Sequence, residues 1–215
     1  MDLDKLMNQH LTRAFDGSKT IPEESLQQLL RFMRSAPTST NIQPNHFYVL
    51  ASAEAKRQLA DNLGERFQDN GAKILNSSHT LILTTRADVP DSHLDDVFGK
   101  EDADGRFPDP AKRAMWQYMT RDFLNLRNYA YKDLNHWMEK QTYLVMGMAM
   151  MAAVELGFDA TPLEGFDPTS VDKAFKIRET GHTTTVLLAL GYPDEEKAYK
   201  GPISRFDADR LFTFM

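Results

Sequence analysis

Three short segments carry polar groups whose types and spacing could hold a ligand. Residues 35–44 (SAPTSTNIQP) gather hydroxyls and amides directly after an expected helix, where they can hydrogen-bond a polar molecule. Asn70 and Lys73 stand three residues apart, so an amide and a cation share one face if the segment is helical. In residues 161–167 (TPLEGFD), Gly165 lacks a Cβ and lets the backbone approach a ligand closely. Taken singly, each segment is better explained by an ordinary feature: a capped turn, a solvated surface and a plain connector, respectively.

Several other kinds of chemistry are excluded or disfavoured. The chain has no cysteine, which excludes disulfides, thiolate catalysis and cysteine-ligated zinc or iron–sulfur sites. The dinucleotide-binding G-x-G-x-x-G, the phosphate-binding P-loop and the hydrolase G-x-S-x-G patterns are absent. No two of the six histidines have H-x-x-x-H spacing, and the acidic run 101–105 lacks the remaining ligands of a calcium loop. We therefore expect no metal site.

The apolar periodicity predicts the elements that must position the three segments. Thr20 and Glu23 form a capping-box pattern ahead of an i, i+3, i+4, i+7 apolar series, which predicts an amphipathic helix ended by Pro37. The other predicted elements are helices over residues 53–63 and 133–156 and strands over residues 46–50, 80–84 and 183–190. The helix over 133–156 is apolar on nearly all sides, so we expect a partner subunit to cover part of it.

Two further segments extend beyond this core. Residues 88–128 are richly charged and contain three prolines, which is typical of a helical excursion over the surface that could act as a mobile lid. Residues 192–215 form a tail that ends in the apolar sequence LFTFM, and we expect it to dock on a partner subunit. No repeat or linker divides the chain. Residues 1–215 are therefore expected to form one α+β domain.

Composition narrows the partners and the location. The net charge is −6 and no run of Lys and Arg occurs, so neither a nucleic acid nor an anionic membrane surface is an expected partner. The most apolar stretch, residues 143–154, is shorter than the roughly 20 residues that a spanning helix needs. The N-terminal MDLDK is too acidic for a signal or transit peptide. These features predict a cytoplasmic protein.

Taken together, the segments resemble one known family. From about residue 6 to residue 205, the chain resembles the FMN-dependent nitroreductases, in particular the oxygen-insensitive NAD(P)H nitroreductases related to dihydropteridine reductase. Each motif is weak alone, but their order and spacing are specific. The motifs are TRAFD at 12–16, residues 37–44, Asn70 with Lys73, EDADGRF at 101–107, WM at 137–138 with KQ at 140–141, PLEGFD at 162–167, and Ser204-Arg205.

The resemblance implies a fold, an assembly and a reaction. The fold would be a central mixed, mostly antiparallel sheet flanked by helices, built as an intertwined homodimer with two FMN sites at the subunit interface. NADH or NADPH would reduce the flavin, and a nitroaromatic, quinone or similar small-molecule acceptor would then take the electrons in a ping-pong exchange. The flavin carries this chemistry, so no side-chain nucleophile is required.

The resemblance also assigns residues to the flavin ring. Arg13 and Lys73 would lie beside N1 and O2, where the reduced flavin carries negative charge. Asn70 would hydrogen-bond the pyrimidine edge, and the backbone around Glu164 and Gly165 would meet N5. The residues expected to back the ring are Pro162 and Leu163.

Other site residues would come from a second stretch of chain. Thr38, Ser39 and Asn41 would reach the flavin from the other subunit, with Gln141 nearby. The expected substrate-binding residues are Thr40, Arg106, which would touch the nicotinamide donor, and Phe123, which would line the substrate face.

The pattern departs from the family at the FMN phosphate. The usual Arg-x-Ser/Thr pair falls on Gln9 and Leu11, and a basic position near the C-terminus falls on Ile203. Losing two charged hydrogen bonds would cost about 3–6 kcal/mol, or roughly 10²- to 10⁴-fold in affinity. Either FMN is held weakly or other groups compensate. The residues expected to hold this end are His10, Thr12, Ser204 and Arg205, together with backbone N–H groups.

Two alternatives stay open at this point. The protein could be a flavin reductase or a dihydropteridine reductase of the same family, because the acceptor pocket lies on variable segments. It could also be a non-catalytic, flavin-binding dimer, and the missing phosphate contacts favour this alternative.

Overall fold

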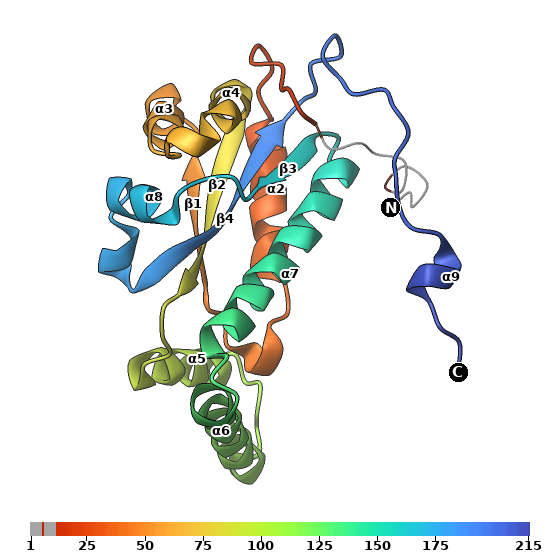
Figure 1. Ribbon diagram of the computed structural model, residues 1–215. Coiled ribbons are helices and arrows are strands. Elements are labelled where there is room, and N and C mark those ends of the chain that lie inside the picture. The colour runs from red at the N-terminus through yellow and green to blue at the C-terminus, as the bar shows by residue number, and fades with distance from the viewer. Residues whose placement is uncertain (1–5, 7–11) are drawn as a thin grey trace.

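The computed structural model describes residue 6 and residues 12–215, and an antiparallel β-sheet forms its centre (Figure 1). The described residues contain four strands in the order β1-β2-β4-β3. Their bounds are Asn45–Leu50 (β1), His79–Arg86 (β2), Asp159–Leu163 (β3) and His182–Gly191 (β4). β2 pairs with β1 and β4, and β3 pairs with β4. All three ladders are antiparallel, so the described part of one chain contributes no parallel pair to the mixed sheet that the resemblance implies.

Helices connect and cover these strands. The longer ones are α2 (Glu23–Arg34), α3 (Ala53–Asp61), α5 (Asp91–Ala103), α6 (Pro110–Asn125) and α7 (Leu134–Glu155). The shorter ones are α4 (Gly71–Asn76), α8 (Pro168–Ala174), α9 (Ala208–Leu211), the 3₁₀ turns η1 (Ser39–Asn41), η2 (Glu65–Asn70) and η4 (Ile177–Thr180), and the π-turn η3 (Leu126–Ala130). No helix within the described ranges has both the length and the apolar character to cross a bilayer.

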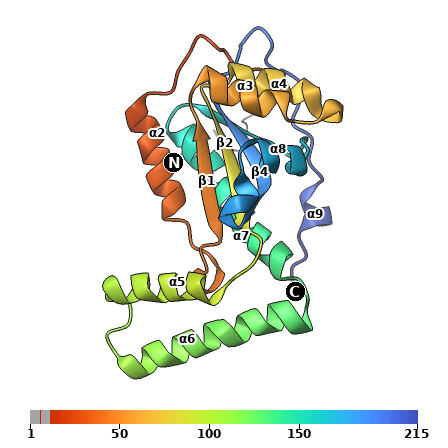
Figure 2. The ribbon, with the colours of Figure 1, turned by 90° about the vertical axis from the view of Figure 1, so that its left-hand side faces the viewer.

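Two helical layers enclose the sheet (Figure 2). Because side chains alternate along a strand, Leu81 and Leu83 of β2 face α2 and α7, whereas Ile82 faces α3 and α4. α8 packs on the same face as α3. Both faces of β2 and of most of β4 are therefore buried, which accounts for their nearly continuous apolar and threonine sequences.

The α+β class is confirmed, and the predicted strands at 46–50, 80–84 and 183–190 are present as β1, β2 and β4. Two predictions were wrong. α2 begins at Glu23 after Pro22, and no side chain caps it, so Thr20 does not form a capping box. Residues 161–163 are not part of a connector between helices, because they pair with β4 as the end of β3.

The excursion over residues 88–128 is helical, as predicted. α5 and α6 form a hairpin that projects beyond one end of the sheet (Figure 1). Its inner side packs on Ile42, Trp137 and Met138 in an apolar cluster separate from the two sheet cores. The hairpin is thus anchored to the start of α7 and to residues next to β1. That the hairpin moves as a lid stays a prediction.

The tail leaves the sheet at the end of β4 and runs away from the two layers (Figure 1). Backbone bonds tie its start to the N-terminal segment, since the Asp16 N–H donates to Tyr192 O and the Asp194 N–H donates to Ala14 O, both at 2.9 Å. Beyond that point large apolar side chains are exposed, namely those of Phe206, Leu211, Phe212, Phe214 and Met215. Docking of the tail on a partner subunit stays a prediction.

Candidate active site

Asn70 and Lys73 form a fixed polar pair at the start of α4. The Lys73 Nζ donates to Asn70 Oδ1 at 2.7 Å, and the Asn70 Nδ2 donates to the Gly165 carbonyl at 2.9 Å. Lys73 is half-buried, and no carboxylate in the described ranges pairs with it. A cation without an acidic partner stabilises negative charge on any group that binds beside it.

Gly165 brings its backbone against this pair. A Cβ at Gly165 would lie 2.6 Å from Asn70 Nδ2, closer than real Cβ contacts allow, and 3.1 Å from the Phe67 ring, which is tighter than most. Among the described residues, no carbonyl or side chain accepts a hydrogen bond from the Gly165 N–H, and the residue is only partly buried. A free N–H beside a fixed amide and a cation is a suitable donor set for a planar heterocycle with nitrogen and oxygen acceptors.

Tyr143 fixes the side chain next to Gly165. Its hydroxyl donates to Glu164 Oε1 at 2.7 Å. Partial burial, together with this carboxylate, raises the pKa of Tyr143 to about 12. The Glu164 carboxylate is thereby held on α7. Of the two residues expected to back the ring, Pro162 is half-buried and Leu163 is buried, both on β3.

Residues 38–43 form a second polar group, with an unusual backbone. Thr40, Asn41 and Gln43 have positive φ angles of 53°, 55° and 45°, a conformation that non-glycine residues seldom adopt. The Ser39 N–H donates to Gln141 Oε1 at 2.9 Å, and the Gln43 N–H donates to Thr38 Oγ1 at 3.0 Å. These bonds hold the turn in the strained form.

The two groups lie far apart within one chain. Residues 38–43 stand at the end of the sheet that carries α5 and α6, whereas α4 lies toward the opposite end (Figures 1 and 2). One chain therefore brings Asn70, Lys73 and Gly165 together, but not with Ser39 and Gln141.

The expected substrate-binding residues are engaged by neighbours. The Arg106 guanidinium lies 3.5 Å from the carboxylate of Glu101, and the Asn41 amide donates to the same carboxylate at 2.8 Å. The Phe123 ring contacts Trp137 edge-to-face at 5.5 Å between centroids. The Arg127 guanidinium lies 4.9 Å from the centroid of the Phe123 ring. Thr40 donates its hydroxyl to the Ser39 carbonyl at 2.7 Å.

The phosphate end of the expected site is not assembled among the described residues. Thr12 is buried and donates its hydroxyl to the Asp159 carboxylate, which leaves that hydroxyl no proton for a phosphate. Arg13, which the resemblance places with Lys73 at the ring, is exposed, with its guanidinium 4.7 Å from the centroid of the Tyr199 ring, and no contact among the described residues joins it to Lys73. Ser204 and Arg205 are exposed on the tail. The prediction for His10 lies outside the described residues, as do Gln9 and Leu11.

Sequence reasoning missed the partners that fix these groups. Glu101 lay within a motif that the resemblance used, but its burial was not predicted, because a buried acid depends on donors from distant segments. Phe67 and Tyr143 carried no signal, since a single aromatic residue is ordinary at any position.

The described residues thus form an antiparallel sheet between two helical layers, with Lys73, which no described carboxylate pairs with, beside the backbone of Gly165. This α+β arrangement suits a planar polar ligand. Residues 6–192 match the nitroreductase family, and the chain belongs to this family of oxidoreductases.

Relatives with known names support this placement. The chain is 33% identical over 208 residues to the oxygen-insensitive NAD(P)H nitroreductase of Salmonella typhimurium, covering 96% of each chain. It is 29% identical over 212 residues to the major NAD(P)H-flavin oxidoreductase of Aliivibrio fischeri, covering 98% of this chain and 96% of the relative. Its fold matches the crystal structure of a putative nitroreductase in complex with FMN from Exiguobacterium sibiricum. That match has a TM-score of 0.83 and 20% identity, and it covers 100% and 98% of the two chains.

Proposed function

We propose that the protein is an FMN-dependent oxidoreductase that takes hydride from NADH or NADPH and passes electrons to nitroaromatic or quinone acceptors in a ping-pong cycle. The observation that carries this proposal is the arrangement of Lys73, Asn70 and Gly165. Within the described part of the chain, no carboxylate pairs with this lysine, and no group accepts from the nearby Gly165 N–H. The names of the 33% and 29% identical relatives support the electron donor and the flavin.

The residues present fit the pyrimidine side of a flavin. FMN, when bound, supplies the hydride exchange between donor and acceptor. In that site Lys73 and Arg13 would stabilise the negative charge of a reduced flavin. Asn70, which accepts a hydrogen bond from Lys73, would bind the edge of the ring, and the Gly165 N–H would offer it a further donor. Pro162 and Leu163 would back the ring.

A homodimer completes the site in this proposal. Thr38, Ser39 and Asn41 would reach the flavin of the partner subunit, since they lie at the opposite end of the sheet from Lys73 within one chain. Gln141 holds the Ser39 backbone at 2.9 Å and so supports this role from α7. Thr40, Arg106 and Phe123 of the same end would line the face on which donor and acceptor bind.

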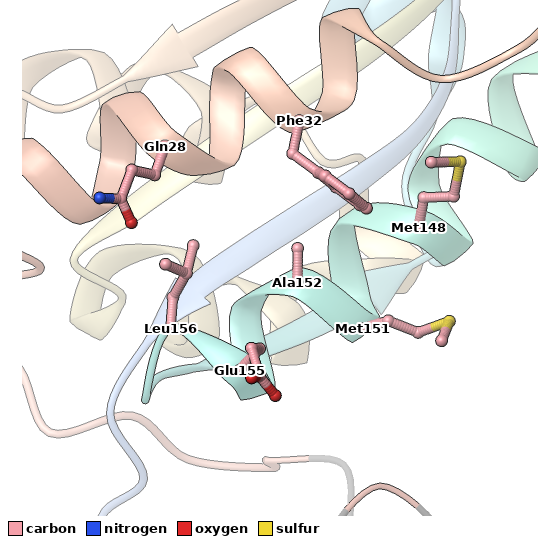
Figure 3. Close-up of a pocket in the computed structure, with 7 residues that line it drawn as sticks. All are labelled: Gln28, Phe32, Met148, Met151, Ala152, Glu155 and Leu156. Atoms are coloured by element: carbon pink, nitrogen blue, oxygen red, sulfur yellow. The ribbon is translucent and has the colours of Figure 1, made fainter. Parts of the chain in front are cut away.

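An apolar groove between α2 and α7 supports the dimer. It has a volume of 490 Å³, and Phe32, Met151 and Leu156 are among the residues that line it (Figure 3). Phe32 and Met151 are 42% and 43% exposed, although each contacts this apolar surface. Exposed apolar surface of this kind marks a protein–protein contact.

An absorption spectrum of the purified, dialysed protein tests the proposed function. We expect either a yellow protein or a colourless one that turns yellow with added FMN, and we expect anaerobic NADH or NADPH to bleach it. Bound flavin that neither nucleotide bleaches would favour the non-catalytic, flavin-binding dimer. A protein that stays colourless with FMN would reject the proposal.

One observation favours a second function at the same site. Gln9, Leu11 and Ile203 remove the usual phosphate contacts, and the Thr12 hydroxyl is already bonded to Asp159. A flavin held weakly can leave after reduction, which is the behaviour of a flavin reductase. Titration with FMN separates the two functions, because release between turnovers needs a Kd in the micromolar range or weaker.

A further inference from the structure

Glu101 is a buried acid that joins three separate segments. It lies on α5 with only 4% of its surface exposed. One carboxylate oxygen, Oε1, accepts from the Asn41 amide at 2.8 Å and lies 3.5 Å from the Arg106 guanidinium. The other oxygen, Oε2, accepts from the indole N–H of Trp116 on α6 at 3.2 Å. Burying a carboxylate is costly unless it is paired and hydrogen-bonded, so the three donors must stay in place together.

These donors belong to the two segments that shape the substrate face. Asn41 lies in the strained turn over residues 38–43 and has a positive φ angle, as do two other residues of that turn. Trp116 lies seven residues before Phe123 on α6, so both side chains lie on one side of the helix, two turns apart. Arg106 lies in the segment between α5 and α6, with its guanidinium 5.3 Å from the centroid of the Trp116 ring.

We infer that Glu101 is a positioning residue, which sets the turn over residues 38–43 against α6 and thereby fixes the opening through which donor and acceptor reach the flavin. One carboxylate oxygen accepts from the turn and the other accepts from α6. A shift of α6 therefore displaces the carboxylate that holds Asn41. The inference rests on the proposed function, since the opening matters only if substrates pass through it. Glu101 itself contacts no reacting group.

The variant E101Q tests this role while it preserves the shape of the side chain. An amide offers one oxygen and one NH₂ group where the carboxylate offers two oxygens. Asn41 and Trp116 donate to opposite oxygens, so one of them must face another donor in the variant. We expect kcat/KM for the acceptor to fall by about tenfold or more, mostly through KM, and the Kd of FMN to rise by a smaller factor, because the same turn carries residues that reach the partner's flavin. A larger loss of flavin affinity than of acceptor kcat/KM would contradict the role at the opening.

In the double variant E101Q/N41D, the hydrogen bond between positions 41 and 101 can re-form with donor and acceptor exchanged. The new amide can donate to the introduced carboxylate and accept from Trp116, and the carboxylate can pair with Arg106. We expect amide hydrogen exchange in residues 38–43 of the apo-protein to return to within about threefold of the wild-type rate, a readout that does not depend on the role of Asn41 at the flavin. Without that recovery, the Glu101–Asn41 contact does not position the turn.

Asp172 provides the matched control. It is also a buried carboxylate with both oxygens engaged, because Oδ1 accepts from the N–H and hydroxyl of Thr184 and Oδ2 accepts from Arg178 Nε at 3.0 Å. It lies on α8, away from the hairpin. D172N should lower thermal stability as E101Q does and leave the acceptor KM unchanged.

Amide hydrogen exchange of the apo-protein gives a readout that needs no activity. In E101Q we expect faster exchange both in residues 38–43 and in residues 110–125. In D172N we expect neither segment to exchange faster than in the wild type. Acceleration of one segment alone would overturn the inference. If the wild type binds no FMN but E101Q loosens both segments, the proposed function fails and the positioning contact stands.

Discussion

Lys73 is a half-buried cation whose Nζ contacts an amide oxygen instead of a carboxylate. Replacing it by methionine removes the charge and keeps most of the side-chain volume. We expect K73M to bind oxidised FMN about 10- to 100-fold more weakly, because a hydrogen bond from a charged group contributes about 1.5–3 kcal/mol. The reduced flavin should lose still more affinity, so the midpoint potential of the bound flavin should fall.

Fluorescence titration and a spectroelectrochemical titration measure these two effects. K100M serves as the control, because Lys100 is an exposed lysine paired with Asp104 on the hairpin. Equal flavin affinities for K73M and the wild type would contradict the placement of Lys73 beside the ring.

At Gly165 even the smallest side chain should destabilise the protein and disturb the flavin site. A Cβ there would lie 2.6 Å from Asn70 Nδ2, on an amide already held by Lys73. We expect G165A to lower the free energy of unfolding by about 1–3 kcal/mol and to weaken FMN binding.

G99A is the matched control for G165A. Gly99 lies inside α5 with open space around its Cα, so alanine there should stabilise the protein by about 0.4–1 kcal/mol. Urea unfolding measures the free energy of unfolding of both variants, and FMN titration measures their flavin affinity. Normal flavin binding by G165A would show that this backbone does not approach the ring.

His93 and His182 give the hairpin end of the sheet a dependence on pH. Burial lowers the pKa of both side chains, and the Arg86 charge lowers it further. Below pH about 6.5, the unfolded chain binds protons that the folded state takes up less readily, so stability should fall as the pH falls. The His93 Nε2–H donates to the Ile42 carbonyl at 2.7 Å, which links this loss to the turn over residues 38–43.

The variant H182N isolates one of these histidines. Each contributes at most about 1.4 kcal/mol per pH unit to the slope of stability against pH, and less where solvent screens it. Urea unfolding between pH 5 and pH 8 should therefore give a shallower slope for H182N. At pH 8 the side chain at position 182 is neutral in both proteins, so their difference there gives the pH-independent effect. Parallel curves would contradict the prediction.

The elements that could be predicted from sequence are those with local signals. β2 and β4 appear as short, β-branched, apolar runs, and α7 has an unbroken helical pattern. β3 could not be predicted, because Pro162 and Gly165 indicate a loop, whereas pairing with β4 at the sheet edge tolerates a proline.

The site residues likewise fall into those that could be predicted from sequence and those that could not. The resemblance supplied Asn70, Lys73 and Gly165, and their hydrogen bonds are present. Glu101 could not be found as a hub, because its partners come from Asn41 and Trp116, and only the tertiary fold brings those segments together.

The whole molecule exposes apolar surface in the groove between α2 and α7 and along the tail. The variant M151E places a charge in that groove. If a second copy covers the groove, an unpaired buried charge costs about 3–5 kcal/mol, so the dimer should weaken by at least about 100-fold. Sedimentation equilibrium measures this change, and FMN affinity should fall with it.

L75E is the control for M151E. Leu75 is similarly exposed, at 39%, but lies on α4, on the opposite face of the sheet from α2 and α7. It should leave the oligomeric state unchanged. A fully dimeric M151E protein would exclude this groove as the subunit contact.

Strand β4 lies between β2 and β3, although it is the last of the described strands to leave the ribosome. His79 of β2 pairs with Leu190 of β4, and Ala160 of β3 pairs with the same residue, so the sheet cannot close until β4 has been translated. Until then β2 has β1 alone as a neighbour, and a two-stranded ribbon is marginally stable by itself. Before β4 emerges, the nascent chain therefore carries an unpaired apolar strand edge, and such an edge exposes a chain to aggregation.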